Sequence, residues 1–167
     1  EQLVATLSHG ALTPFFDLGP LSHLAPGTRY LMTLDSDTGL PPGRLRTLVG
    51  VAEHPRNQPR LAPDGSRVVS GYGILQPRVV APLPPPGQSG TVWQWLFASQ
   101  PGLDPYSAMS SDVYQDVFDE GSFTGKGLLH VATLHAVLAG RLPVDQVLSH
   151  DLLEGALVRC ALVTDVT

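Results

Sequence analysis

The sequence predicts an α/β domain in which helices flank a mixed β-sheet. Runs of β-branched and aromatic residues alternate along the chain with stretches of helical spacing, and clusters of glycine and proline separate them. The 167 residues suit one domain with a real core and are too few for two full domains. With 17 glycines, 16 prolines and only 15% charged residues, the chain is rich in turns and poor in charge.

Charge and hydropathy argue against several classes of protein. The 10 basic and 15 acidic side chains give a formal net charge of -5, which argues against a nucleic-acid partner. With 43% apolar residues the chain is too hydrophobic for disorder. It has no uninterrupted run of about 18 apolar residues that would span a bilayer. Cys160 is the only cysteine, and its apolar surroundings predict a buried, inert thiol.

The first half of the chain predicts a strand, an acidic loop and a helix. Residues 29–34 form a continuous β-prone run of the kind found in buried strands, and the acidic segment 35–39 follows them. Leucine and valine at helical spacing in residues 45–52 predict a helix with prolines near its first turn. Residues 1–24 have partly helical spacing that glycines and prolines interrupt.

The second half alternates further strands and helices. We expect a polar turn region at 55–66, extended chain at 67–80 weakened by Gly71 and Gly73, and a proline-rich loop at 81–90. Helical patterns follow at 91–99, 110–118, 131–139 and 149–160, and a strand closes the chain at 161–166.

Asp35 and Asp37 are the first candidate functional residues. In extended chain both side chains would project to one side, at the carboxyl end of a strand, where open α/β sheets bind ligands. Two neighbouring carboxylates repel one another unless a cation lies between them, and Mg²⁺ commonly takes one or two protein carboxylates together with water and phosphate oxygens. The alternative is a solvated aspartate turn that caps the next helix.

Asp151 and Glu154 form a second acidic site, on one face of the helix that Ser149 and His150 open. Taken alone, these are ordinary first-turn residues, because acidic side chains there complement the helix dipole. Together with Asp35 and Asp37, however, these carboxylates would complete a set of catalytic groups. A metal-binding acidic pair and a distant carboxylate acting as general base are the minimum for metal-assisted displacement at a phosphate-bearing carbon.

The segment 120–127 contains Lys126, the only lysine of the chain, and imitates a phosphate-binding loop. It does not match the pattern of such loops, because its first glycine is at 121 instead of 120 and Gly127 stands where a serine or threonine should bind Mg²⁺. A loop that shapes a substrate site and a plain connecting turn both remain open. The six histidines show no paired spacing and no cysteine partners, so we do not expect zinc.

A series of motifs extends along residues 28–167. They are Leu34 to Thr38 followed by Leu40 to Gly43, Gly71 to Arg78, Asp104 to Tyr106, Ser111 to Asp116, Glu120 to Gly127, and Leu148 to Gly155. In this order they resemble the glycosyltransferase segment of cyclic β-1,2-glucan synthases, which are large bacterial membrane enzymes. The Asp-x-Asp pair alone is weak, whereas matching runs of this length are specific.

The resemblance implies an inverting glucosyltransferase of the GT-A type that uses UDP-glucose to extend a β-1,2-linked glucan. It implies that Asp35 and Asp37 hold Mg²⁺ or Mn²⁺ and the donor diphosphate, and that Asp151 is the general base. Gly125, Lys126, His150 and Glu154 are further candidates for contacts with the acceptor or the substrate.

The resemblance also implies that residues 1–167 are the central and C-terminal part of a glycosyltransferase domain. Related enzymes carry an earlier nucleotide-binding aspartate and a later Gln-x-x-Arg-Trp motif, and neither is present here. We therefore expect an incomplete fragment that binds UDP-glucose weakly or not at all. The rest of the parent enzyme would be its partner, at the bacterial inner membrane, with this segment on the cytoplasmic side, where UDP-sugars are made.

Two alternatives come from other classes of protein. A non-catalytic carbohydrate-binding or scaffolding fragment would stack sugars on Trp93, Trp95, Tyr106 and Tyr114, although such aromatics more often belong to a core. A phosphohydrolase of the haloacid dehalogenase type also begins with Asp-x-Asp at a strand end. In that family threonine or valine stands two places after the second aspartate. Here that position is Gly39, and the threonine, Thr38, comes one place earlier.

Overall fold

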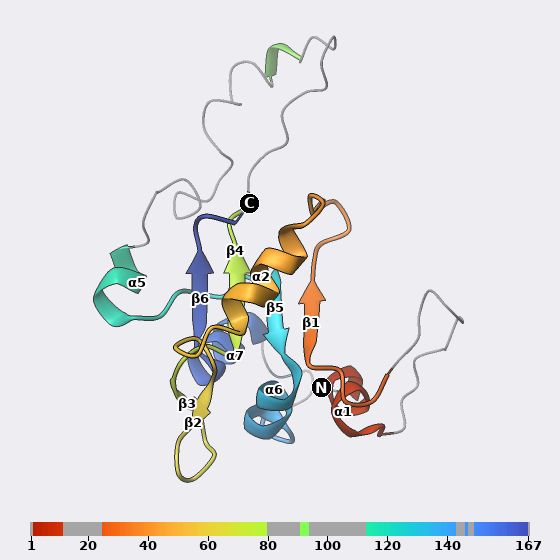
Figure 1. The fold of residues 1–167 in the computed structure, drawn as a ribbon, viewed down its shortest axis with the longest axis vertical. Coiled ribbons are helices and arrows are strands. Elements are labelled where there is room, and N and C mark those ends of the chain that lie inside the picture. Colours follow the sequence, from red (N-terminus) through yellow and green to blue (C-terminus); the bar gives the residue numbers. More distant parts are fainter. Residues whose placement is uncertain are drawn as a thin grey trace.

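A computed structural model describes residues 2–11, 25–79, 91–93, 113–142, 146 and 149–166. Its centre is a sheet with the strand order β1 (Tyr30–Thr33), β5 (Gly127–His130), β4 (Ile74–Pro77) and β6 (Cys160–Val163) (Figure 1). β5 is antiparallel to both β1 and β4, whereas β4 and β6 are parallel. The predicted α/β fold with a mixed sheet is therefore confirmed. A small ribbon of β2 (Arg60–Leu61) and β3 (Val68–Ser70) lies apart from this sheet.

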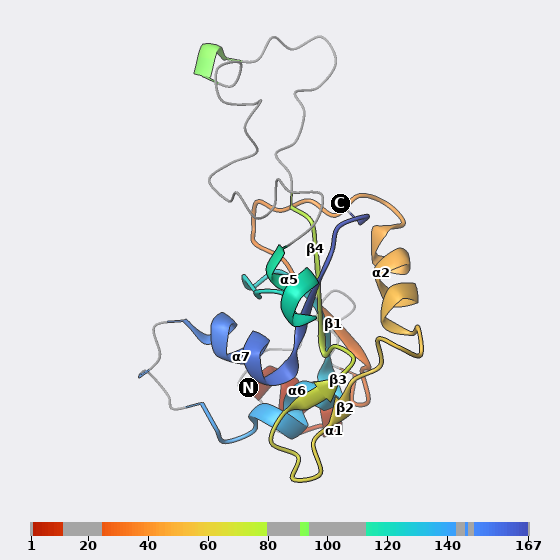
Figure 2. The same ribbon diagram turned by 90° about the vertical axis from the view of Figure 1, so that its left-hand side faces the viewer.

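Helices cover both faces of the sheet (Figure 2). α2 (Arg44–Ala52) lies on one face, and α6 (Val131–Leu138) and α7 (His150–Val158) lie on the other, where α1 (Gln2–His9) packs on α6. Alternate strand residues enter the two cores, as the strand period of two requires. On the α6 and α7 side the buried apolar residues of the central sheet are Ile74, Leu129 and Cys160, and on the α2 side they are Leu75, Leu128, Ala161 and Val163.

Two glycines split the extended run that the sequence predicts at 67–80 into β3 and β4. Gly71 has a φ of +67°, and a Cβ atom on it would collide with the carbonyl group of Gln58. A Cβ atom on Gly73 would collide with the side chain of Val158, at the end of α7. Both glycines therefore allow a close approach of two chain segments, which interrupts the strand.

α5 (Val113–Phe118) protects the exposed edge of β6. The Gln115 side chain pairs with the backbone of Leu162 as a strand would: its Nε2 donates to the carbonyl oxygen at 3.0 Å, and its Oε1 accepts from the amide at 2.6 Å. The Gly121 amide then donates to the carbonyl oxygen of Cys160 at 2.7 Å. These bonds occupy backbone groups that an edge strand would otherwise expose.

A polar cluster at the end of α7 fixes where that helix stops. Arg159 has a φ of 58° and donates from Nη2 to Asp119 Oδ2 at 3.1 Å, and Asp119 has the same left-handed φ. The Tyr72 hydroxyl donates to the other Asp119 oxygen at 2.9 Å, and burial raises the pKa of this tyrosine. A residue with left-handed backbone does not continue an α-helix, so α7 ends before Arg159. β6 begins at the next residue, Cys160.

Most predicted elements are confirmed, and several boundaries are corrected. The strand at 29–34 and the helices at 45–52 and 131–139 are present as β1, α2 and α6. The helix predicted at 149–160 ends at Val158, and the last strand ends at Val163, where a turn follows. Cys160 is fully buried, as predicted. β2 lies in the region 55–66 that was expected as a polar turn, and no strand was predicted at the position of β5. The predictions at 12–24, 81–90, 94–99 and 110–112 lie outside the described residues.

Candidate functional site

Asp35 lies just beyond the carboxyl end of β1. The strand ends at Thr33, and the Thr38 amide donates to the Asp35 carbonyl oxygen at 3.0 Å, which closes a turn around Asp37. The prediction that Asp35 and Asp37 project to one side of an extended chain is therefore wrong, because this turn interrupts the strand. Both side chains are exposed. The turn does not cap α2, whose N-cap residue is Gly43 and whose first amides receive no side-chain capping bond.

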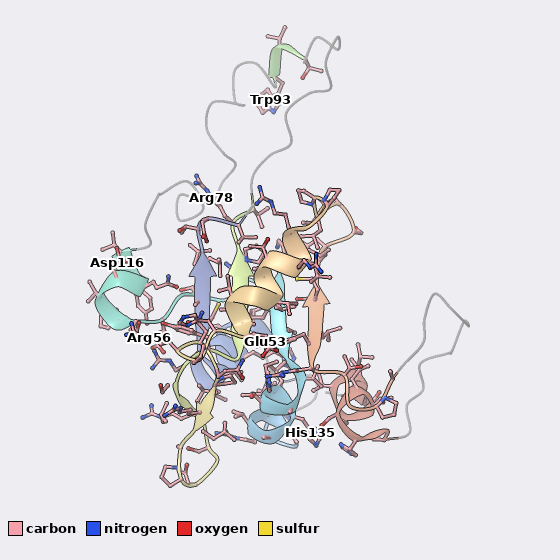
Figure 3. All side chains as sticks on the ribbon, in the orientation of Figure 1. Glu53, Arg56, Arg78, Trp93, Asp116 and His135 are labelled. Atoms are coloured by element: carbon pink, nitrogen blue, oxygen red, sulfur yellow. The ribbon has the colours of Figure 1, made fainter. Side chains whose placement is uncertain are left out.

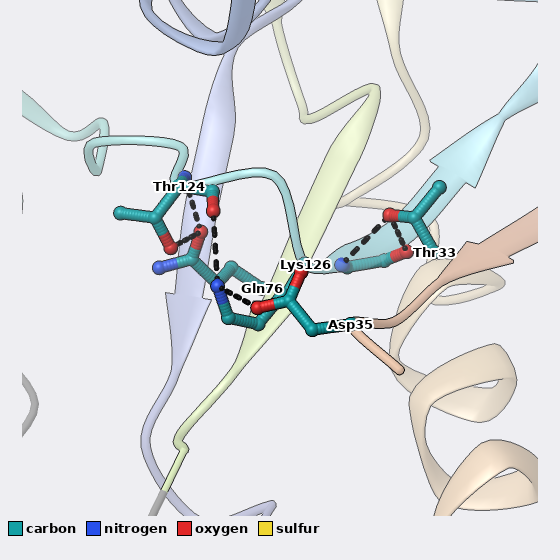
Figure 4. Close-up of polar contacts among 6 residues, drawn as sticks. Thr33, Asp35, Gln76, Thr124 and Lys126 are labelled. Carbon is teal, nitrogen blue, oxygen red and sulfur yellow. Dashed lines mark hydrogen bonds and ion pairs between the residues drawn. The ribbon is translucent and has the colours of Figure 1, made fainter. Parts of the chain in front are cut away.

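The register of the sheet places Lys126 beside Asp35. Gly127, the first residue of β5, pairs with Thr33, the last residue of β1, so the residue before Gly127 meets the chain that leaves β1. Lys126 Nζ lies 2.8 Å from Asp35 Oδ2 (Figure 4). The lysine side chain is 23% exposed and that of Asp35 is 56% exposed. The cation of this ion pair is thus the more shielded partner.

Hydrogen bonds from two strands hold the segment 124–127 in place (Figure 4). Gln76 of β4 is buried, and its Oε1 accepts from the Thr124 amide at 2.8 Å and from the Thr124 hydroxyl at 3.1 Å. Thr33 Oγ1 accepts from the Gly127 amide at 3.2 Å and donates to the Gly127 carbonyl oxygen at the same distance. The backbone on both sides of Lys126 is therefore fixed to the sheet.

Asp151 reaches the same segment from α7. A Cβ atom built on Gly125 would stand 3.0 Å from Asp151 Oδ2, and Gly125 has a φ of +86° that favours glycine. One helical turn further along α7, a Cβ atom on Gly155 would stand 2.9 Å from the Cβ atom of Phe123. Residues four apart share a helix face. α7 therefore packs on the segment 123–125 through the face that carries Asp151 and Gly155.

The structure thus brings four of the candidate residues together. The Asp35 carboxylate contacts Lys126, and the Asp151 carboxylate contacts the preceding residue, Gly125. Two carboxylates from distant parts of the chain therefore face consecutive residues of one loop. His150 is exposed at the start of α7, and Ser149 occupies the N-cap position without a side-chain capping bond.

Glu154 points to a different place. It lines a hollow between α1, α6 and α7, together with apolar residues and His135, whose position is labelled in Figure 3. Burial raises the pKa of Glu154, the negative charge of Asp151 raises it further, and His150 lowers it. The His135 Nδ1 atom is buried without a hydrogen-bond partner, and the His9 ring lies 4.8 Å from the His135 ring. Glu154 therefore faces this hollow and is close enough to Asp151 for the two charges to interact.

The donor set suits a hard divalent cation better than zinc. Within the described parts of the chain, no group of three or more histidine, cysteine, aspartate or glutamate side chains is gathered. Asp35 and Asp37 offer two exposed carboxylates in one turn. Mg²⁺ keeps several waters and uses one or two carboxylates plus substrate phosphates, so two such ligands fit it.

Sequence reasoning missed the residues that position the loop. Gln76 interrupts an otherwise apolar strand, where a buried side-chain amide needs a hydrogen-bond partner, and this was the available signal. Its partner Thr124 could not be identified, because it lies 48 residues further along the chain. Gly155 gave no signal, since a glycine in a helical pattern has many explanations.

The aromatic residues proposed to stack on sugars are only partly described. Trp93 is 70% exposed and lies beyond the end of the sheet (Figure 3). Tyr114 is 46% exposed on α5, where its ring lies 4.8 Å from that of Phe118. Trp95 and Tyr106 lie outside the described residues.

The fold and the site define a mixed α/β segment that presents carboxylates and one lysine at the end of its sheet. No family model matches the chain. Over 140 residues, 84% of its length, the chain is 51% identical to the cyclic β-(1,2)-glucan synthase NdvB of Rhizobium meliloti (strain 1021). The chain is therefore related to a segment of a glucan synthase. The matched part covers 5% of NdvB, so the chain spans only a small fraction of that relative.

The comparison supports the family resemblance that the sequence motifs imply, at the level of glucan synthesis. For the described residues of this chain, no helix is both long and apolar enough to cross a membrane.

Proposed function

We propose that the chain forms part of the catalytic centre of an inverting glucosyltransferase of the GT-A type, which extends a β-1,2-glucan from UDP-glucose. The observation that carries this proposal is the convergence of Asp35 and Asp151 on the loop of Gly125 and Lys126. The identity with a cyclic β-(1,2)-glucan synthase supports the substrate class. Because the chain spans 5% of that relative, we assign the activity to a longer protein in which this segment acts.

Asp151 is the general base of the proposed reaction. It removes the proton from the 2-hydroxyl of the acceptor glucose as that oxygen attacks the anomeric carbon of the donor. The new carbon–oxygen bond forms on the face opposite the leaving group, the bond to the diphosphate breaks, and UDP departs with the bonding electrons. One displacement therefore inverts the α-linked donor to a β-linked product. Asp151 is partly exposed, so a hydroxyl group can reach it.

Asp35 and Asp37 are the residues that would hold Mg²⁺ or Mn²⁺. When bound, the cation supplies positive charge that neutralises the leaving diphosphate. The other partners of the site are the glucan acceptor and the rest of the membrane enzyme. We place this segment on the cytoplasmic side of the bacterial inner membrane, because UDP-sugars are made in the cytoplasm.

The test is glucose transfer by the full-length protein that carries this chain. We expect Asp151→Asn to lower the rate of transfer from labelled UDP-glucose to glucan by about 10²–10⁴, the usual contribution of a placed base. The matched control is Asp116→Asn, which removes an exposed carboxylate on α5 and should leave the rate near that of the wild type.

An Asp151→Asn variant that is folded and fully active would refute the assignment of the base. Binding of β-1,2-glucan that persists without metal, without UDP and without Asp35 would favour a carbohydrate-binding segment instead. In that case both Asp35→Asn and Asp151→Asn would leave glucan affinity unchanged.

A further inference from the structure

Lys126 holds an unusual position for the only lysine of the chain. Its ammonium group is 2.8 Å from Asp35 Oδ2 and donates to the Thr124 carbonyl oxygen at 3.4 Å. The lysine side chain is only 23% exposed. An ion pair with a partner as exposed as Asp35 stabilises a fold little. The stability of the fold therefore does not explain why a shielded cation points at this carboxylate.

The backbone around Lys126 is fixed, whereas its ammonium group is on a flexible stem. Thr124 is bonded to Gln76 and Gly127 to Thr33, so the residues on both sides are tied to the sheet. A lysine side chain carries its charge on four methylene groups with freely rotating donors. The ammonium group can therefore exchange one anion for another while the loop stays in place.

Three carboxylates of the described residues belong to the loop of Lys126 or to the segments that contact it. Asp35 pairs with it, Asp37 lies in the same turn as Asp35, and Asp151 contacts the adjacent Gly125. A divalent cation and an ammonium group that share one carboxylate repel one another, so each weakens the binding of the other at Asp35. A lysine displaced from a carboxylate is a ready ligand for phosphate, which it binds as a point charge.

We propose that Lys126 and the divalent cation compete for the Asp35 carboxylate, and that the displaced ammonium group binds the diphosphate of the sugar donor. The proposal rests on the proposed function and adds to it a residue of the donor site. Lys126 then contributes to the donor site in two opposite ways: it weakens the binding of metal alone and strengthens the binding of metal with diphosphate.

The first experiment measures the binding of Mn²⁺ alone to the full-length protein that carries this chain, from the spectroscopic signal of the free ion. We expect Lys126→Met to bind Mn²⁺ more tightly than the wild type by at least about fivefold, the lower end of a typical coupling between two ligands. The control is Arg46→Met, which removes the same charge from an exposed position on α2 and should leave the affinity close to that of the wild type.

The second experiment adds inorganic diphosphate to the same full-length protein in saturating Mn²⁺. Lys126→Met should now bind the anion more weakly, by about tenfold or more, which is within the range of such couplings, while Lys126→Arg should retain most of the affinity. A purely structural lysine would not give opposite changes in the two measurements.

The outcomes separate this proposal from the one on which it rests. If Asp35→Asn abolishes Mn²⁺ binding but Lys126→Met does not tighten it, the competition is refuted and the metal site stands. If Mn²⁺ binding is unaffected by Asp35→Asn, the metal assignment fails and the competition fails with it. Equal tightening by Lys126→Met and Arg46→Met would show only a general effect of charge and would also refute the competition.

Discussion

The backbone of Gly125 lies directly against the carboxylate of Asp151. A Cβ atom on Gly125 would stand 3.0 Å from Asp151 Oδ2, which is closer than such atoms ordinarily approach. The contact joins the first turn of α7 to the loop that precedes β5, two elements that no strand pairing connects. The position of the proposed base therefore depends on the absence of a side chain at residue 125.

Replacing this glycine should disturb the site more than it disturbs the fold. Gly125→Ala forces alanine into a φ of +86°, which costs about 1–2 kcal/mol, and it also pushes on the Asp151 carboxylate. A displacement of about 1 Å in a catalytic group can cost about 100-fold in rate, so we expect a loss of that order in glucan synthesis.

Gly43 provides the matched control. It has a φ of +83°, and a Cβ atom on it would meet nothing within 4 Å. Gly43→Ala should therefore lower the free energy of unfolding by about as much as the backbone cost at Gly125, about 1–2 kcal/mol, without lowering activity. Denaturant unfolding and glucose transfer, measured on both variants, test the difference. Equal activity in the two variants would contradict the role of the contact.

A second glycine sets how closely α7 approaches the loop. A helix ordinarily gains about 0.5–1 kcal/mol when glycine is replaced by alanine. At Gly155 the new Cβ atom would stand 2.9 Å from the Cβ atom of Phe123, a buried residue, so we expect a loss of about 1–3 kcal/mol from overpacking instead.

Gly50→Ala, in α2, shows what the same replacement does in open space. Gly50 is exposed, and a Cβ atom added there would meet nothing within 4 Å, so the free energy of unfolding of this variant should rise. Opposite signs for Gly155→Ala and Gly50→Ala in thermal unfolding would confirm the close packing of α7. A gain in both would mean that α7 has room to accept a side chain at residue 155.

Local patterns predicted the elements that local forces decide. β1, α2 and α6 follow from periodicity within a few residues, and the position of Asp151 in a first helical turn follows from Ser149 and the acidic residues after it. β5 was missed because its four residues, Gly127–His130, lead into α6 without a turn signal, and only pairing with β1 and β4 makes them a strand.

The contacts between residues of the candidate site also depend on pairing between distant segments, so local sequence patterns did not predict them. Lys126 meets Asp35 because Gly127 pairs with Thr33, a register that two distant segments decide together. The sequence left a turn at Asp37 open as the alternative, because Asp-x-Asp after a strand fits both a turn and extended chain; the structure shows the exposed turn but not the predicted cap on α2. The sequence therefore indicated the candidate side chains but not their contacts.

Gln76 should matter for both stability and activity. Gln76→Met keeps the size of the side chain but removes the oxygen that accepts from Thr124, which leaves a loop amide without its partner at a cost of about 1–3 kcal/mol. Because this loop carries Gly125 and Lys126, glucose transfer should fall as well.

Gln115→Met is the control, since the Gln115 side chain bonds the edge of β6 at Leu162. It should lower stability by about 0.5–1.5 kcal/mol and leave the activity of the folded protein unchanged. Loss of activity in both variants to the same extent would contradict a specific role for Gln76.

The pKa of Glu154 gives a prediction for the pH dependence of stability. Burial raises this pKa above its ordinary value of 4.5, and the charge of Asp151 adds to the shift. In the pH window above 4.5 the folded chain therefore binds more protons than the unfolded chain, so the free energy of unfolding falls as the pH rises through that window. Glu154→Gln removes this titratable carboxyl group. The variant should be more stable than the wild type at neutral pH, and the difference should shrink as the pH falls toward 4.5.

Asp64 should show the opposite sign. Its carboxylate accepts from the Ser66 amide at 3.0 Å, and this bond lowers its pKa below the ordinary value of 3.8. The stability that Asp64 contributes is therefore present above pH 3.8 and is lost as the pH falls through the lower pKa of the folded chain. Asp64→Asn should be less stable than the wild type at neutral pH, although only slightly because the group is exposed, and the two should converge in acid. Urea midpoints between about pH 2 and 7, which covers the ordinary pKa values of aspartate and glutamate of about 3.9 and 4.3, test both variants. If Glu154→Gln is less stable than the wild type at neutral pH, the Glu154 carboxylate is stabilised in its hollow and the burial argument fails.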